Sequence, residues 1–103
     1  MSKFEDLYDK DTINNISYTN VSAFYDLKKR LVDRRRKLYT IEELAKEIGE
    51  PVREVAEFEQ YYSDPTVSQI EEYALAVGVS LKIVREEHPT KTEADQSDKN
   101  NQK

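Results

Sequence analysis

Two short helical segments are separated by a glycine, one residue and a proline, and this punctuation constrains the fold more than any other feature. The first segment, 41–48, has apolar residues on one face. Thr40 precedes it and Glu43 follows three positions later, a spacing at which each side chain satisfies a backbone NH at a helix start. Gly49 suits a helix end and Pro51 suits the first position of a new helix. The two helices must therefore cross steeply.

The spacing of apolar residues predicts three further helices beside the 41–48 segment. One covers 21–39, one covers 51–60 and one covers 67–77. Thr66 and Gln69 repeat the capping-box spacing at the start of the last helix, and a glycine ends it. The expected fold class is all-α, a small bundle of four to five helices in the helix-turn-helix arrangement.

The two ends of the chain are predicted to lie outside this bundle. Residues 1–20 form an arm or a short helix, 21–85 form the domain, and 86–103 form a polar tail that lacks the apolar side chains needed to order it. Apolar and polar residues alternate over 79–84, which predicts a short strand or an extended segment. A strand there would pair with a second protomer or with the N-terminal arm of its own chain.

The composition argues against several classes of function. The sequence has no cysteine and its single histidine, His88, lies in a polar stretch, so no metal site and no thiol chemistry are expected. No cofactor is expected, and no combination of nucleophile, base and orienting residue marks an enzyme. No apolar run is long enough for a membrane span and no signal peptide is present, so the protein is expected in the cytoplasm.

Charge is unevenly distributed along the chain. Seven basic residues and one acidic residue fall between Lys28 and Lys37, a local charge of +6, although the whole chain carries −5. The rest of the chain therefore carries −11. This distribution permits one cationic surface that suits a polyanion; alternatively, the basic run is an ordinary solvated helix face.

The segment from Thr40 to Leu81 follows a pattern of threonine, acidic, apolar and glycine positions. Its matching residues are Thr40, Glu42, Glu43, Leu44, Ala45, Gly49, Val55, Phe58, Glu59, Pro65, Ile70, Ala74, Val77, Gly78 and Val79. In these residues the chain resembles the XRE or lambda-Cro-like family of bacterial and phage transcription regulators. The resemblance implies a regulator that binds specific double-stranded DNA sequences as a homodimer, with residues 51–60 as the recognition helix in the major groove.

Several residues depart from the family pattern where DNA is usually contacted. Ile41 stands where the family has glutamine, Pro51 and Val52 stand where it has small polar residues, and Tyr61 stands where it has glycine. The recognition helix also carries one basic and three acidic residues. These departures support a second hypothesis, in which the fold is a protein-interaction module or an accessory phage or mobile-element factor that has lost strong DNA binding.

The predicted site residues of the recognition helix have alternative roles. Arg53 is predicted to bind guanine O6 and N7 with its planar fork, or else to pair with Glu57 one turn later. Glu54 either accepts a hydrogen bond from a cytosine amino group or serves solubility. The resemblance implies that Glu59 pairs with one of the arginines at 34–36. The full predicted DNA-binding set is Arg53, Glu54, Val52, Glu57, Arg35, Arg36, Lys37, Tyr61 and Tyr62.

The remaining members of this set are predicted to contact the DNA backbone. Arg35, Arg36 and Lys37 lie at the end of the first predicted helix and are expected to bind phosphate. Tyr61 and Tyr62 either donate hydroxyl hydrogen bonds to phosphate or cover the corner between the third and fourth helices.

Overall fold

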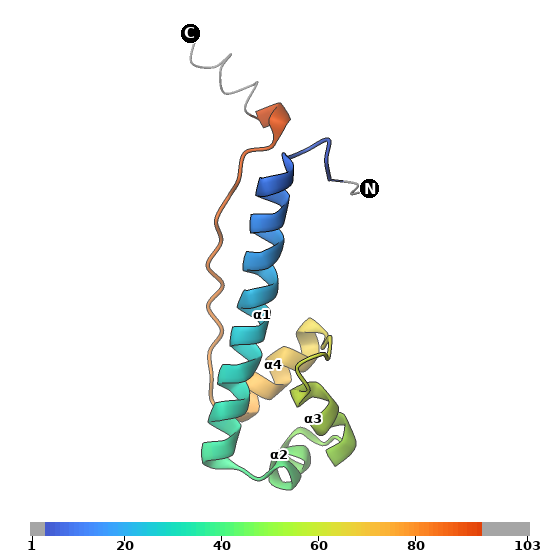
Figure 1. The fold of residues 1–103 in the computed structure, drawn as a ribbon. Coiled ribbons are helices and arrows are strands. Elements are labelled where there is room, and N and C mark those ends of the chain that lie inside the picture. The colour runs from blue at the N-terminus through green and yellow to red at the C-terminus, as the bar shows by residue number, and fades with distance from the viewer. Residues whose placement is uncertain (1–3, 94–103) are drawn as a thin grey trace. The chain divides into compact units, whose positions relative to one another are not determined.

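Four α-helices make up most of the chain (Figure 1). The structure is a computed structural model that describes residues 4–93. The helices are α1 (Lys10–Leu38), α2 (Ile41–Ile48), α3 (Val52–Glu59) and α4 (Val67–Ala76), and a further helical turn covers 91–93. The all-α class is confirmed, with no β-strand among the described residues. The chain divides into two units, one of residues 23–83 and one formed by the segments before and after it.

All four helices contribute to the core of the 23–83 unit. Its buried side chains are Leu31, Val32, Leu44, Ala45, Val55, Phe58, Tyr73, Ala74 and Val77. The rings of Phe58 and Tyr73 stack with their centroids 4.5 Å apart, which joins α3 to α4. Burying a large apolar side chain contributes about 1.5–3 kcal/mol, so this core determines which face of α3 points outward.

Both predicted capping boxes are present. At α2 the Glu43 NH donates to the Thr40 hydroxyl at 3.1 Å, and the Thr40 NH donates to the Glu43 carboxylate at 2.8 Å. At α4 the Gln69 NH donates to the Thr66 hydroxyl at 3.1 Å, and the Thr66 NH donates to the Gln69 side-chain oxygen at 2.7 Å. Gly49 ends α2 at φ 80°, a left-handed conformation that favours glycine. The predicted bounds 41–48 are therefore confirmed.

The third helix is shorter at both ends than the predicted 51–60. Pro51 has φ −62° but ψ 147°, so its backbone is extended and it forms the N-cap instead of the first helical residue. Gln60 is likewise extended at ψ 138° and ends the helix. The prediction that Pro51 lies at the helix start is correct, but the first helical residue is Val52, one position later than predicted.

The first helix begins much earlier than the predicted residue 21. The Thr12 NH donates to the Asp9 carboxylate at 2.8 Å, which caps the helix, and no glycine or proline interrupts the chain from Lys10 to Leu38. The buried residues of α1 are Leu31 and Val32, near its end, so the earlier turns carry little of the apolar signal on which the prediction depended. No helix within the described residues has the length and apolar character needed to cross a membrane.

The segment after α4 is extended (Figure 1), which is one of the two predicted alternatives; the other, a short strand, is not formed over 79–84. The Val79 NH donates to the Ala74 carbonyl at 2.9 Å and closes α4. No backbone ladder follows over 80–84 within the described residues, because no second strand lies beside the segment. An extended backbone with alternating apolar residues remains.

The other unit contains residues 4–22 and 84–93. In it the Lys91 NH donates to the Leu7 carbonyl at 2.9 Å, and the Lys91 ammonium donates to the Glu5 carbonyl at 2.9 Å. The tail predicted to be disordered, 86–103, is therefore held by hydrogen bonds near residue 91. Residues 94–103 of that tail lie outside the described residues.

Candidate nucleic-acid interface

The turn between α2 and α3 leaves the start of α3 uncovered. The NH groups of Gly49 and Glu50 both donate to the Ala45 carbonyl, at 2.9 and 3.0 Å, which completes α2 within two residues. Pro51 then caps α3 without a side-chain hydrogen bond. Arg53 lies in the first turn, with its side chain 85% exposed. An uncapped helix start beside an exposed arginine is suited to negatively charged groups.

The inward face of α3 is fixed by a buried ion pair. The Arg35 guanidinium donates to both Glu59 carboxylate oxygens, at 2.9 and 2.6 Å, and the Tyr73 hydroxyl donates to the same carboxylate at 2.6 Å. The side chains of Arg35 and Glu59 are only 12% and 11% exposed. This confirms the ion pair expected for Glu59 and identifies its partner among the three arginines.

The same ion pair corrects the role predicted for Arg35. Its guanidinium also donates to the Tyr39 carbonyl at 3.4 Å, so its donors are directed into the fold. The hydrogen bond to Glu59 raises the pKa of Arg35, and burial together with that carboxylate raises the pKa of the Tyr73 hydroxyl. Arg35 therefore positions α3 and does not present its charge to phosphate.

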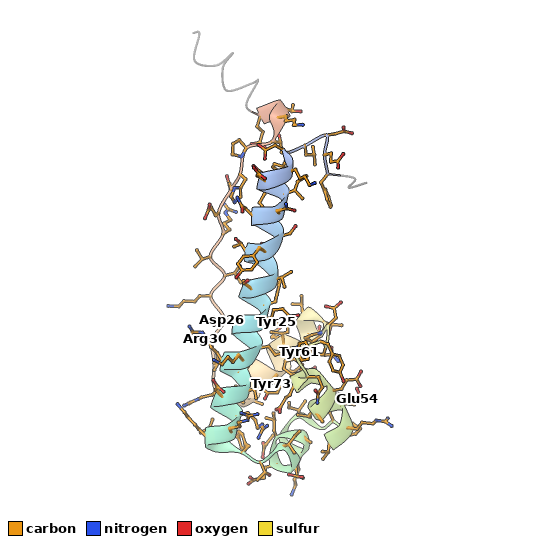
Figure 2. All side chains as sticks on the ribbon, in the orientation of Figure 1. Tyr25, Asp26, Arg30, Glu54, Tyr61 and Tyr73 are labelled. Atoms are coloured by element: carbon orange, nitrogen blue, oxygen red, sulfur yellow. The ribbon has the colours of Figure 1, made fainter. Side chains whose placement is uncertain are left out.

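The outward face of α3 carries one positive and two negative charges. Arg53 lies 3.9 Å from the Glu54 carboxylate and forms no ion pair with Glu57, the alternative partner suggested by the sequence. Glu54, which Figure 2 labels on α3, has a side chain that is 43% exposed and that also faces α4, and Glu57 is exposed. Val52 is 42% exposed at the helix start. Because Glu59 is buried, the outward face of α3 carries a net charge of −1 from Arg53, Glu54 and Glu57, and not the −2 of the whole helix.

Lys28 and Arg34 join Arg35 among the basic residues of α1 that are bound within the fold, three of the seven in the run. The Lys28 ammonium donates to the Gln60 carbonyl and to the hydroxyl and carbonyl oxygens of Ser63, at 2.7 and 3.3 Å for the latter two. The Arg34 guanidinium donates to the Val77 carbonyl at the end of α4, at 3.1 Å. These side chains tie α1 to the loop after α3 and to α4.

A smaller cationic surface remains after these contacts. Arg30 forms an exposed ion pair with Asp26 at 2.7 Å. Lys29, Arg36 and Lys37 are exposed and form no hydrogen bond or ion pair within the part of the chain that the structure describes. Arg36 and Lys37 occupy the last turn of α1, where a positive charge is also favourable to the helix dipole. Lys29 was missed by the sequence reasoning, although it belongs to the same basic run.

The start of α2 is closed to an external anion. The Glu43 carboxylate already accepts from the Thr40 NH, and its hydrogen bonds with Thr40 lower the pKa of Glu43. Ile41, which replaces the glutamine of the family pattern, packs against the core. The contact that this helix start usually provides is therefore absent.

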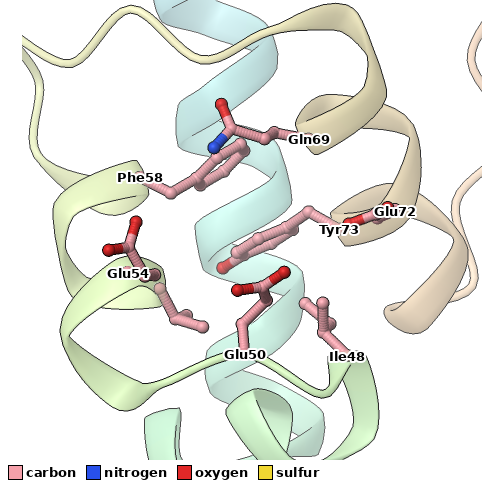
Figure 3. Close-up of a pocket in the computed structure, with 8 residues that line it drawn as sticks. Ile48, Glu50, Glu54, Phe58, Gln69, Glu72 and Tyr73 are labelled. Carbon is pink, nitrogen blue, oxygen red and sulfur yellow. The ribbon is translucent and has the colours of Figure 1, made fainter.

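A small hollow of about 70 Å³ lies between the α2–α3 turn and α4 (Figure 3). It is lined by Ile48, Glu50, Glu54, Val55, Phe58, Gln69, Glu72 and Tyr73. Its three carboxylates make it unfavourable for a phosphate group. Among the described residues, no group of three or more His, Cys, Asp or Glu side chains is arranged to hold a metal ion.

Tyr61 and Tyr62 are exposed beyond the end of α3. Their rings are 73% and 70% exposed and meet edge to face at 5.6 Å. They therefore do not cover the corner between α3 and α4. Ser63 closes that corner instead, because its hydroxyl donates to the Phe58 carbonyl at 2.7 Å.

Comparison with known proteins gives one match. A family model described as helix-turn-helix matches residues 33–84, from the last turns of α1 through α4 and the extended segment after it. No curated protein and no solved structure matches the chain.

Proposed function

Because the chain belongs to the XRE and lambda-Cro-like family of helix-turn-helix DNA-binding regulators, we propose that it is a sequence-specific transcriptional regulator and acts as a homodimer on double-stranded DNA. The observation that carries this proposal is the exposed Arg53 at the uncapped start of α3. A steep turn leaves this end of the helix free to enter a major groove about 12 Å wide. Such a role places the protein with its DNA, in the cytoplasm.

Arg53 is the residue proposed to read a base. Its neighbour Glu54 is 3.9 Å away and both side chains reach solvent, so their attraction is weak and leaves the guanidinium free to turn toward DNA. A planar guanidinium binds guanine O6 and N7 together, which discriminates against other bases by about 1–3 kcal/mol. Glu54, Glu57 and Val52 share this face and are proposed to exclude unsuitable bases.

Phosphate contacts are assigned to Arg36 and Lys37 in the last turn of α1. Lys29, about two turns earlier on the same helix, is a weaker contributor. These side chains are exposed and have no internal partner among the described residues. Arg35 is left out because its charge is buried against Glu59. Contacts from Tyr61 and Tyr62 would require DNA to reach the opposite end of α3 from Arg53, and these tyrosines are assigned a different role below.

A homodimer is proposed because one domain can contact only one half-site of DNA. A single recognition helix reads one half-site, and two half-sites about one helical turn of DNA apart require a second copy related by two-fold symmetry. A dimer also offsets the small number of exposed cations in each protomer, because the phosphate contacts of both copies contribute to the same complex.

The acidic outward face of α3 favours a second function, a protein-interaction module. Glu54 and Glu57 outnumber Arg53, and DNA phosphates near them would be repelled. In this alternative the exposed α3 surface binds a basic partner protein, and duplex DNA is bound only through weak contacts of the α1 end.

Salt dependence separates the two functions. Titrating the full chain against promoter fragments of its own organism at low and high salt should show specific binding that weakens as salt rises. Arg36→Ala and Lys37→Ala should each reduce the slope of log K against log salt by about 1. Arg85→Ala is the matched control, because Arg85 is an exposed arginine that is already paired with Glu87 and lies outside the 23–83 unit. Absence of any binding at about 50 mM salt would overturn DNA binding.

Arg53→Ala tests the base contact separately. We expect this variant to lose preference at one base pair and to keep its nonspecific affinity and its salt slope. A loss of equal size on every sequence, with a smaller salt slope, would show that Arg53 binds phosphate instead.

A further inference from the structure

Four exposed aromatic side chains lie on one side of the 23–83 unit. Phe24 and Tyr25 on α1 are 65% and 48% exposed, and Tyr61 and Tyr62 after α3 are 73% and 70% exposed. We call these four residues the aromatic patch. Aromatic residues are enriched at protein interfaces, and clustered exposed apolar side chains are unusual on a surface without a partner.

Lys28 brings the two halves of the patch together. Phe24 and Tyr25 precede Lys28 by four and three residues, which puts all three on one face of α1. The Lys28 ammonium bonds to Gln60 and Ser63, the residues on either side of the tyrosine pair. Figure 2 labels Tyr25 on α1 and Tyr61 in the loop after α3, the two segments that Lys28 joins. The patch is thus held in place by hydrogen bonds between α1 and the loop after α3.

Charges of both signs surround the patch. Asp26 and Arg30 form an exposed pair on α1, and Lys29 lies beside them. Glu57 and Asp64 precede and follow the tyrosine pair in the sequence, and both are exposed. A rim with both signs can match a second copy of itself when the copy is turned by two-fold symmetry, because the α1 cations of one protomer then meet the acidic side of the other.

The four aromatic residues of the patch are separate from Arg36, Lys37 and Arg53, whereas Lys29 and Glu57 lie at its rim and belong to both surfaces. Twelve positions of α1 separate Phe24 from Arg36, which corresponds to about 18 Å along the helix. Tyr61 follows the end of α3, whereas Arg53 lies in its first turn. A partner on the patch and DNA on the α3 start can therefore be bound together.

We propose that the aromatic patch is the contact between two copies of this chain. The inference rests on the proposed homodimeric regulator and specifies the surface that joins its protomers. At roughly 150–250 Å² for each buried aromatic side chain, the exposed parts of the patch supply on the order of 500 Å² per protomer. Two protomers together then bury about 1,000 Å², the lower limit for a specific interface. Tyr61 replaces a glycine of the family pattern, so the patch belongs to this chain in particular.

Sedimentation velocity of the full chain without DNA tests the proposal. The wild type should dimerise, and Phe24→Ala and Tyr61→Ala should each raise the dimer dissociation constant at least about tenfold. The controls are Val67→Ala and Leu75→Ala, whose side chains are both 80% exposed but lie on α4 outside the patch. The controls should change the constant less than about twofold, and all four variants should keep the wild-type melting temperature when it is measured below the dimer dissociation constant.

Cross-linking gives a second measurement that does not depend on weakening the dimer. The sequence contains no cysteine, so Tyr62→Cys introduces a single thiol. Mild oxidation should convert this variant, but not Leu75→Cys, into a covalent dimer.

The outcomes distinguish this inference from the function on which it rests. A dimer that resists Phe24→Ala and Tyr61→Ala, or that weakens equally in the α4 controls, overturns the patch and leaves the homodimeric regulator intact. A wild type that remains monomeric at high concentration overturns both the patch and the homodimer. DNA binding is judged independently, by the salt slopes of Arg36→Ala and Lys37→Ala.

Discussion

At the scale of single residues, three neighbouring arginines of α1 make different contacts. Arg34 donates to the Val77 carbonyl, Arg35 binds Glu59 with two hydrogen bonds, and Arg36 points to solvent. One helix residue turns the side chain by about 100°, so consecutive positions meet different surroundings. The side chain that faces the core becomes structural, and only the exposed one is available to a ligand.

Arg35→Ala should therefore destabilise the fold, whereas Arg36→Ala should not. Removing Arg35 leaves Glu59 buried with one remaining hydrogen bond, from Tyr73. Breaking a buried ion pair on one side costs about 3–5 kcal/mol, and an exposed helical arginine changes stability by less than about 0.5 kcal/mol. Urea denaturation of both variants measures the difference. Equal stability of the two variants would contradict the structural role of Arg35.

The capping box at α2 should make part of the stability depend on pH. Hydrogen bonds with Thr40 lower the pKa of Glu43 in the folded state. A lowered pKa stabilises the fold above the unfolded pKa, and that contribution is lost as pH falls through the folded value. The melting temperature of wild type should therefore exceed that of Glu43→Gln at neutral pH, with the gap closing below about pH 4.

The glutamine variant is a fair comparison because α4 already uses Gln69 in the same capping geometry. The neutral cap is thus expected to form, and only the charge is removed. A gap between the two melting temperatures that stays constant down to pH 3 would show that the charge of Glu43 contributes nothing.

At the scale of elements, local signals predicted the bounds of α2 and the start of α4 and missed the start of α1. The bounds of α2 follow from Thr40, Glu43 and Gly49, whose interactions lie within a few residues of one another. The start of α1 at Lys10 carries no core residue, so apolar spacing gave no signal there. Over 79–84 the predicted extended segment is observed and the alternative, a strand, is not, because strand pairing depends on a partner that a local pattern cannot supply.

The site was predictable in its elements but not in its side-chain assignments. The exposure of Arg53 follows from its place at a helix start, and the sequence identified it. Choosing Arg35 as the partner of Glu59 requires the rotation of α1 relative to α3, which only packing determines. The aromatic patch unites residues more than thirty positions apart, and no local pattern links them.

Gly49, which ends α2, allows the conformational cost of a helix end to be measured. Gly49 has φ 80°, and a Cβ added there would meet no atom within 4 Å. The cost of Gly49→Ala should therefore come from backbone conformation alone, about 1–2 kcal/mol, measured by urea denaturation. Gly49→Asn should cost less, because asparagine adopts the left-handed region more readily. Equal costs would indicate that the turn had shifted to another conformation.

At the scale of the whole molecule, an acidic chain that binds DNA has a physical advantage. The net charge of −5 opposes general attraction to phosphates, whereas Arg36 and Lys37 concentrate positive charge at one end of α1. Nonspecific affinity depends mainly on phosphate neutralisation. Weak nonspecific binding raises the ratio of specific to nonspecific complexes, which decides occupancy of an operator in a genome.

The separation between the aromatic patch and the cationic end of α1 predicts independent energies. Phe24→Ala and Arg36→Ala should each weaken operator binding at protein concentrations near the dimer dissociation constant, and the double variant should show the sum within about 0.5 kcal/mol. Fluorescence anisotropy on one operator measures all four proteins. A double variant no weaker than either single one would show that the two surfaces act through one step.

The division of α3 between its two faces has a consequence for engineering. The positions that pack inward are Val55, Phe58 and Glu59, and those that face solvent are Arg53, Glu54 and Glu57. The Arg35–Glu59 ion pair and the Phe58–Tyr73 stack hold α3 in place. The codons for Arg53, Glu54 and Glu57 can therefore be randomised together. A library of this kind should keep the core and the ion pair constant while it varies the face that is proposed to read DNA, so selection for new operators can act on that face alone.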